Sequence, residues 1–250
     1  ADIITASAGT SNFRAGVNAG NSIASGGNYN TVVGDEAGTA ITTGDSNVFV
    51  GYQSGDATTT ADSNVGIGRG TLSTNILSDH NTAVGNGALF THNQTSTTDS
   101  YNTAVGSNAG AVVTTGVQNT IIGGLAGDAL TTGSYNVILG TNGGGGVTTG
   151  SQNILIGQGT AMAALTGSQN TIVGDSAGAA MTSGTLNVAV GTLALDANQT
   201  GAANTAVGYN ALSANTGDGA TAVGKDALEL NTTGANTAVG ANSLATVTSG

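Results

Sequence analysis

The stretch 102–116, "NTAVGSNAGAVVTTG", recurs with small changes along the chain and decides the fold. Near-copies read "NTIIGGLAGDALTTG" from residue 119, "NTIVGDSAGAAMTSG" from 170 and "NTAVGYNALSANTG" from 204. The shared element is Asn-x-x-x-Gly with an aliphatic residue or alanine before the glycine. The anchor positions are Asn12, Asn30, Asn47, Asn64, Asn81, Asn102, Asn119, Asn136, Asn153, Asn170, Asn187, Asn204, Ala220 (in place of Asn) and Asn236.

The spacing of these 14 copies predicts a solenoid. Most intervals are 17 residues, the first is 18, the last two are 16, and the interval from Asn81 to Asn102 is 21. A single coil of this length cannot bury its own apolar face, whereas stacked coils form a continuous core. We therefore expect an all-β, parallel β-solenoid of about 14 coils of 16–21 residues.

The composition supports strands and turns. Among 250 residues there are 43 glycines and no proline, cysteine or tryptophan, and only 7% of residues are charged. Recurrent Val, Ile and Thr favour strands, and frequent glycine disfavours helices. Each copy is expected to hold two short strands, the "NTAVG" segment and a weaker one such as 109–113, "AGAVV". We expect one repeat domain over 1–250, with a lead-in at 1–11 and repeats at 12–250, as a segment of a longer chain.

The charge of the chain argues against several partners. Its net charge is -11, with 14 acidic groups against Arg14, Arg69 and Lys225. Nucleic acid binding requires Lys and Arg to neutralise phosphates, and anionic membrane surfaces attract basic segments. No apolar run approaches the roughly 20 residues that span a bilayer. We therefore expect no nucleic acid partner and no membrane insertion in this segment.

The alternation of side chains predicts two apolar faces. The residue before each glycine, such as Val33, is expected to face the core. The residue one place earlier should then point outward, because side chains alternate along a strand. This second row is also mostly apolar, and an exposed apolar stripe marks an interaction surface. The predicted subunit contacts in this row are Val32, Phe49, Ile121, Ile138, Leu155 and Ile172.

The asparagines and threonines recur in register and have two readings each. Stacked Asn side chains can form an amide ladder, as in cross-β stacks, or Asn can simply suit the turn before the strand. A threonine column could bind ice, but its parity matches the row expected to face the core, and Val or Ile interrupts it. Its members are Thr31, Thr82, Thr103, Thr120, Thr171, Thr205, Thr221 and Thr237.

The repeat "NTAVGYNAL", followed by "NTG" or "TTG", resembles the repeats of YadA-like trimeric autotransporter adhesin heads and similar repeats of phage tail fibres. The resemblance runs from Asn12 to Gly250. It implies a left-handed β-roll, a homotrimeric fibre, and a location outside the cell or on a virion. It also implies reach and surface attachment as the function, with a surface receptor or glycan of unknown identity as partner. A self-assembling filament, formed by stacking of open ends, is the structural alternative.

No enzyme chemistry is expected. The chain has no Cys, its histidines are His80 and His92, and no catalytic set, cofactor motif or metal-ligand spacing is present. A left-handed-helix acyltransferase would repeat its hexapeptide three times per coil, whereas here it occurs once. The best receptor-contact candidate is the insertion 90–101, because loops on rigid scaffolds often carry function. Its candidate contacts are Phe90, His92, Asn93 and Tyr101, and the two histidines are expected on exposed turns.

Overall fold

A computed structural model describes residues 3–4 and 7–249 and divides the chain into two compact units, 1–132 and 133–250. Each unit is a parallel β-solenoid, and together they have about 13 turns. The predicted all-β, parallel solenoid is therefore confirmed. The sequence predicted about 14 coils because each repeat strand was counted as one coil. Fourteen strands stacked in succession are separated by about 13 turns.

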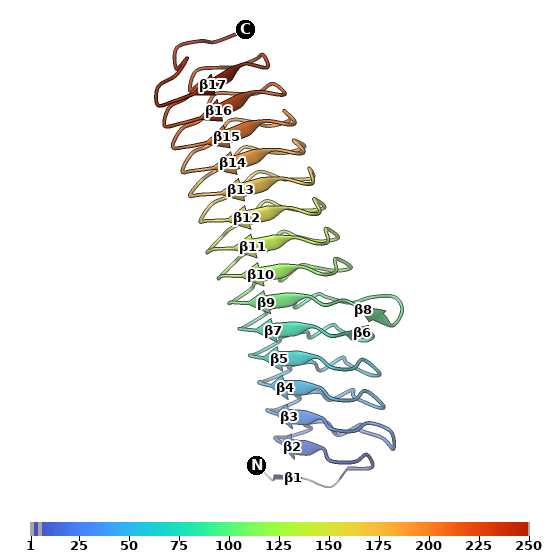
Figure 1. Cartoon of the computed structure of the whole chain (residues 1–250). Helices are drawn as coiled ribbons and strands as arrows, with labels where there is room; N and C mark the ends of the chain where they lie inside the picture. Colours follow the sequence, from blue (N-terminus) through green and yellow to red (C-terminus); the bar gives the residue numbers. More distant parts are fainter. Residues whose placement is uncertain (1–2, 5–6, 250) are drawn as a thin grey trace. The chain divides into compact units, whose positions relative to one another are not determined.

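Apart from β6 and β8, which form a two-stranded sheet of their own, the strands of each unit stack in sequence order along one side of its coils (Figure 1). The first unit contains β1 (Ile3–Ile4), β2 (Phe13–Ala15), β3 (Thr31–Val33), β4 (Val48–Val50), β5 (Val65–Ile67), β6 (Ser78–Asp79), β7 (Thr82–Val84), β8 (Thr98–Asp99), β9 (Thr103–Val105) and β10 (Thr120–Ile122). The second contains β11 (Val137–Leu139), β12 (Ile154–Ile156), β13 (Thr171–Val173), β14 (Val188–Val190), β15 (Thr205–Val207), β16 (Thr221–Val223) and β17 (Thr237–Val239).

The repeat strands pair in parallel and in register within each unit. Thr82 lies opposite Thr103, for example, although their coils are joined by the longest interval. The exception is β1, which pairs with β2 in the antiparallel sense, with Ile3 opposite Ala15. The first strand of the repeat series therefore has its outer edge occupied by the lead-in segment.

The expected second strand of each copy is not formed. Residues 109–113 belong to a series of turns, and outside the main sheet the described part of the chain has only β6, β8 and the bridge between Val147 and Leu165. The reason is a left-handed backbone at alternate residues, with φ of 55° at Asn108 and 57° at Gly110. The coils remain joined there by backbone hydrogen bonds, such as Gly110 N–H to the Ala126 carbonyl at 2.9 Å.

The predicted parity of the strands is wrong. The middle residue of every three-residue strand from β3 to β17 is buried, whereas Arg14 in the middle of β2 is half-buried. The six predicted subunit contacts have no exposed surface at all: Val32, Phe49, Ile121, Ile138, Leu155 and Ile172. They form the core of their own coils and cannot meet another chain. The anchor asparagine causes this parity, because it is itself buried and the residue two places later lies on the same side of a strand. The residue before each glycine therefore points outward.

Buried asparagines form an amide ladder, which confirms the first of the two readings of their repeat. Asn47 donates from its backbone N–H and from Nδ2 to the Oδ1 of Asn30, at 3.0 and 3.1 Å. Its Nδ2 also donates to the carbonyl of Ala61 at 2.8 Å. The second unit repeats this arrangement from Asn153 to Asn204. At Ala220 only the backbone bond to Asn204 remains, at 2.9 Å.

The core is filled by complementary pairs six residues apart. Where the strand residue is large, a glycine usually takes the facing position, as with Ile172 and Gly178, where an added Cβ would lie 2.9 Å from Cδ1 of Ile172. Where the strand residue is alanine, a buried leucine usually takes this position, as with Ala189 and Leu195. Each coil thus keeps a similar core volume, as close packing requires.

Exchanging one pair tests this packing rule. We expect Gly178→Leu to destabilise the fold by about 1–3 kcal/mol through overpacking, and Ile172→Ala by about 2–5 kcal/mol through a cavity. The double variant recreates the pair of the next coil, and Leu195 has a φ of 56°, close to the 57° of Gly178. Urea unfolding should show that the double variant is more stable than either single one. Additive losses would contradict the pairing.

Candidate functional site

The insertion 90–101 lies in the first unit and extends the loop between β7 and β9. Its β8 pairs with β6, with Asp99 opposite Asp79. The loop before β8 reaches farther from the column of strands than the equivalent loops of neighbouring coils (Figure 1). Thr95, Ser96 and Thr97 at its tip are exposed. The extra residues are therefore added on one side of the solenoid without changing the register of the main sheet.

The four predicted receptor contacts do not form one site. Tyr101 is 50% exposed, its ring stacks on His80 at a centroid distance of 4.9 Å, and its hydroxyl donates to Asp99 at 3.2 Å. His80 is exposed, as predicted, and its Nδ1 lies 3.1 Å from Asp99. Asn93 is half-buried and accepts a bond from the Ile76 N–H. Phe90 is 43% exposed and lines a separate hollow.

His92 is wrongly predicted as an exposed contact, because it points into the core and has no exposed surface. Its Nδ1 has no hydrogen-bond partner, and its Nε2 lies 3.5 Å from Nδ2 of Asn102. Burial lowers the pKa of His92 to about 4, and the backbone of Thr114 only partly opposes this. The imidazole is therefore neutral at pH 7.

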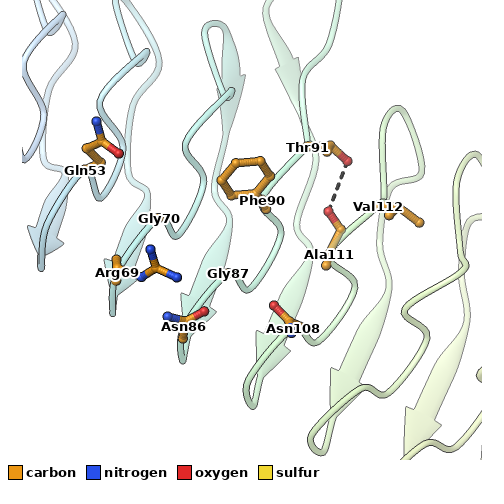
Figure 2. A pocket seen from close by; sticks show the side chains of 10 residues that line it. All are labelled: Gln53, Arg69, Gly70, Asn86, Gly87, Phe90, Thr91, Asn108, Ala111 and Val112. Atoms are coloured by element: carbon orange, nitrogen blue, oxygen red, sulfur yellow. Dashed lines mark hydrogen bonds between the residues drawn. The ribbon is translucent and has the colours of Figure 1, made fainter.

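A hollow of about 390 Å³ lies beside Phe90, across several coils of the first unit. Figure 2 shows the Phe90 ring on one side and the side chains of Arg69, Asn86 and Asn108 on the other. Its full lining is Gln53, Arg69, Gly70, Asn86, Gly87, Phe90, Thr91, Asn108, Ala111 and Val112. The hollow combines an aromatic ring, a guanidinium group and three amide side chains, which is a lining suited to a small polar ligand.

Two glycines at the same repeat position of neighbouring coils create this hollow. The second position after the glycine that ends each repeat strand carries Gln53 in one coil and Asn108 in another, but Gly70 and Gly87 in the two coils between them. The missing side chains leave space that Phe90 borders, since a Cβ on Gly70 would lie 3.4 Å from Cε2 of Phe90. Backbone hydrogen bonds hold the floor, including Gly87 N–H to the Arg69 carbonyl at 2.9 Å.

Sequence reasoning missed Arg69, Gly70, Gly87 and Asn86. A signal was present, because Gly70 and Gly87 replace side-chain-bearing residues at the same repeat position in consecutive copies, and one of the three cations stands next to Gly70. The sequence did not indicate that the Phe90 ring lies beside the space left by Gly70 and Gly87, and only the structure shows it. The aromatic residue was identified from the insertion, whereas its partners come from neighbouring coils.

The outer face of the sheet is the second surface of interest. Each strand exposes its first and third residues there, and the two columns contain aliphatic residues, threonines, Phe13 and Ala15, with no charged residue. In the first unit the third-residue column is Ala15, Val33, Val50, Ile67, Val84, Val105 and Ile122. In the second unit it is Leu139, Ile156, Val173, Val190, Val207, Val223 and Val239.

Carboxylates also stack in the first unit. The carboxylates of Asp62 and Asp79 accept bonds from the backbone N–H groups of Asp45 and Asp62, at 2.6 and 2.7 Å. Burial is the main cause that raises the pKa of Asp79. Across the described residues, no group of three or more His, Cys, Asp or Glu side chains is placed to hold a metal ion. The bonds assign these aspartates a role in joining coils.

Comparisons with known proteins add no identification. No protein-family model, curated protein or solved structure matches this chain. Within the described part of the chain, no helix has the length and apolar character needed to cross a membrane. The hollow beside Phe90 and the outer face of the sheet are therefore the two candidate functional surfaces.

His92 makes a testable contribution to pH-dependent stability. Its folded pKa of about 4 lies below the ordinary 6.5, so the unfolded chain takes up the proton first. The stability that His92 contributes is thus complete above about pH 6.5 and is lost as the pH falls to about 4, by at most about 3 kcal/mol. His92→Asn, which repeats Asn75 of the preceding coil, should remove this component in urea unfolding at pH 7 and pH 4. Parallel pH profiles for the two proteins would contradict it.

Proposed function

We propose that this chain is a structural segment of an extracellular fibre, of the adhesin-head or phage-tail-fibre type, which provides reach and surface attachment. In this proposal the coil is left-handed and three chains associate around a common axis through the outer face of the sheet. The observation that carries it is the absence of any charged residue from both outward columns of β2–β5, β7, β9 and β10 in one unit and of β11–β17 in the other. The resemblance to adhesin-head repeats supports the handedness and the number of chains.

The outer face has the properties of a surface that is buried in an assembly. Ile67, Ile122 and Ile156 are 41, 39 and 36% exposed in the single chain, next to half-buried valines of the same column. Contiguous exposed apolar surface on a soluble protein marks an interaction site. The rest of the chain carries net negative charge and would keep separate fibres apart. We therefore propose that self-association uses this outer face, instead of the buried middle residues of the strands.

End-to-end stacking into a filament is less well supported. Such stacking needs a free parallel edge at both ends of the sheet. At the edge of β2, the backbone is already paired with β1 in the antiparallel sense. Lateral association through the outer face does not require that edge.

The oligomeric state tests the proposal. Light scattering over a range of concentrations should give a constant mass of three chains of 23.7 kDa each. Val173→Lys/Val190→Glu places opposite charges at two adjacent outward positions, which pair directly across β13 and β14. We expect this double variant to be folded and monomeric, because burying even a paired Lys and Glu in an apolar interface carries a large desolvation cost.

The matched control is Gln169→Lys/Leu186→Glu, which places the same charges on exposed turns of the same two coils. It should remain trimeric. A monomeric parent protein, or an equal loss of association in the control, would contradict the outer-face proposal. A mass that grows with concentration would favour the filament.

Ice binding is a second candidate, because the structure reverses the parity argument against it. The threonine column points outward beside the aliphatic column, and both repeat with the regular spacing of paired strands. A monomer with thermal hysteresis that is lost in Val173→Lys/Val190→Glu would support this function. Absence of hysteresis in the parent protein would remove it.

A further inference from the structure

The hollow beside Phe90 holds polar side chains with free hydrogen-bonding capacity. In the described residues, the side chains of Arg69, Asn86 and Asn108 make no hydrogen bond or ion pair with another residue. The other two cations differ, since the Arg14 side chain donates to the Ala19 carbonyl and Lys225 pairs with Asp226 at 3.0 Å. Among the Lys and Arg side chains of the described residues, Arg69 is thus the one without a hydrogen-bond or ion-pair partner.

The backbone around the hollow is held in place before any ligand binds. Asn108 N–H donates to the Asn86 carbonyl at 2.8 Å, and Gly70 N–H donates to the Tyr52 carbonyl at 2.9 Å. The hydroxyl of Thr91 donates to the Ala111 carbonyl at 3.1 Å (Figure 2). A pre-organised cradle reduces the ordering cost that a weak ligand would otherwise have to offset.

The lining matches one class of ligand by its chemistry. Amide side chains both donate and accept, as the hydroxyl groups of a sugar do, and the exposed Phe90 ring offers an apolar surface for the C–H face of a pyranose. A guanidinium group binds a carboxylate through two parallel hydrogen bonds. The chain is acidic overall and offers a single cation here, so a singly charged carboxylate is better matched than a doubly charged phosphate.

We propose that this hollow binds a carboxylated pyranose, with Arg69 on the carboxylate, Asn86 and Asn108 on ring hydroxyls, and Phe90 against the sugar face. The inference deepens the attachment role under Proposed function and rests on it for its biological meaning. Binding itself does not depend on the number of chains. The ligand would be one acidic sugar unit of a surface polysaccharide.

A pair of sugars that differ at one carbon tests the site. Methyl β-glucuronide and methyl β-glucoside differ only by a carboxylate in place of a hydroxymethyl group. In NMR titrations of the full chain, we expect the glucuronide to bind in the millimolar range and the glucoside about tenfold more weakly or worse. Arg69→Gln should reduce glucuronide affinity by about tenfold and leave the glucoside unchanged. Lys225→Gln removes one exposed cation elsewhere and should have no effect.

Filling the hollow gives a second, independent variant. Gly70→Asn introduces the residue type that Asn108 supplies at the same repeat position, with φ of 63° at Gly70 and 55° at Asn108. It should abolish binding of both sugars. The control is Gly159→Asn in the second unit, which also has a φ of 63° and does not line the hollow.

Equal affinity for the two sugars, no binding of the glucuronide, or full glucuronide affinity in Arg69→Gln would each overturn the proposal. If Gly70→Asn did not fold, Arg69→Gln would still decide it. The mass of the same samples reports separately on the outer-face association. A trimer without sugar binding would refute only the sugar site, and a monomer with sugar binding would refute only the fibre assembly.

Discussion

The buried asparagine ladder is the interaction on which the rest of the structure depends. A typical amide of the ladder accepts a hydrogen bond from a backbone N–H of the next coil and donates one to a carbonyl that closes its own coil, as Asn47 does with Asn64 and Ala61. An unpaired polar group in a core costs about 1–3 kcal/mol, so an amide with several buried partners strongly favours one register. The ladder therefore fixes which residues of neighbouring coils lie opposite each other, even across the 21-residue interval.

The same amide determines which side of the strand faces the core. Because Asn30 is buried, Val32 is buried and Thr31 and Val33 point outward. The three-residue strands thus give the coil a thin core, in which a large strand residue leaves room for glycine, or for alanine in the case of Leu155 and Ala161, on the opposite side. Leucine returns where the strand residue is alanine. The outward columns do not pack in the core, so core packing does not explain why they are apolar. Association with other molecules would explain it.

The solenoid and the amide ladder could be predicted from sequence because both depend only on the period of the repeat. The parity could not be predicted by counting apolar residues, since Val32 and Val33 are equally apolar. The sequence nevertheless carried a signal. The large Ile172 is followed six places later by Gly178, whereas the small Ala189 is followed by Leu195, and such compensation in size indicates that the two positions are in contact in the core. The burial of His92 and the hollow beside Phe90 depend on how one irregular coil meets its neighbours, and the repeat itself carries no information on that.

A repeat scaffold can tolerate such local departures because each coil contacts only its neighbours. In the first unit, Gly70, Gly87, Phe90 and the insertion fall within a few consecutive coils, while the register of β5, β7 and β9 stays intact. The hydrogen bonds of the ladder hold these coils together, so the side chains on the surface turns of the same coils are free to vary. A ligand site on such a protein should therefore be sought where the repeat is broken, and an assembly surface where it is most regular. The hollow and the outer face of the sheet satisfy these two conditions on different surfaces of the coils.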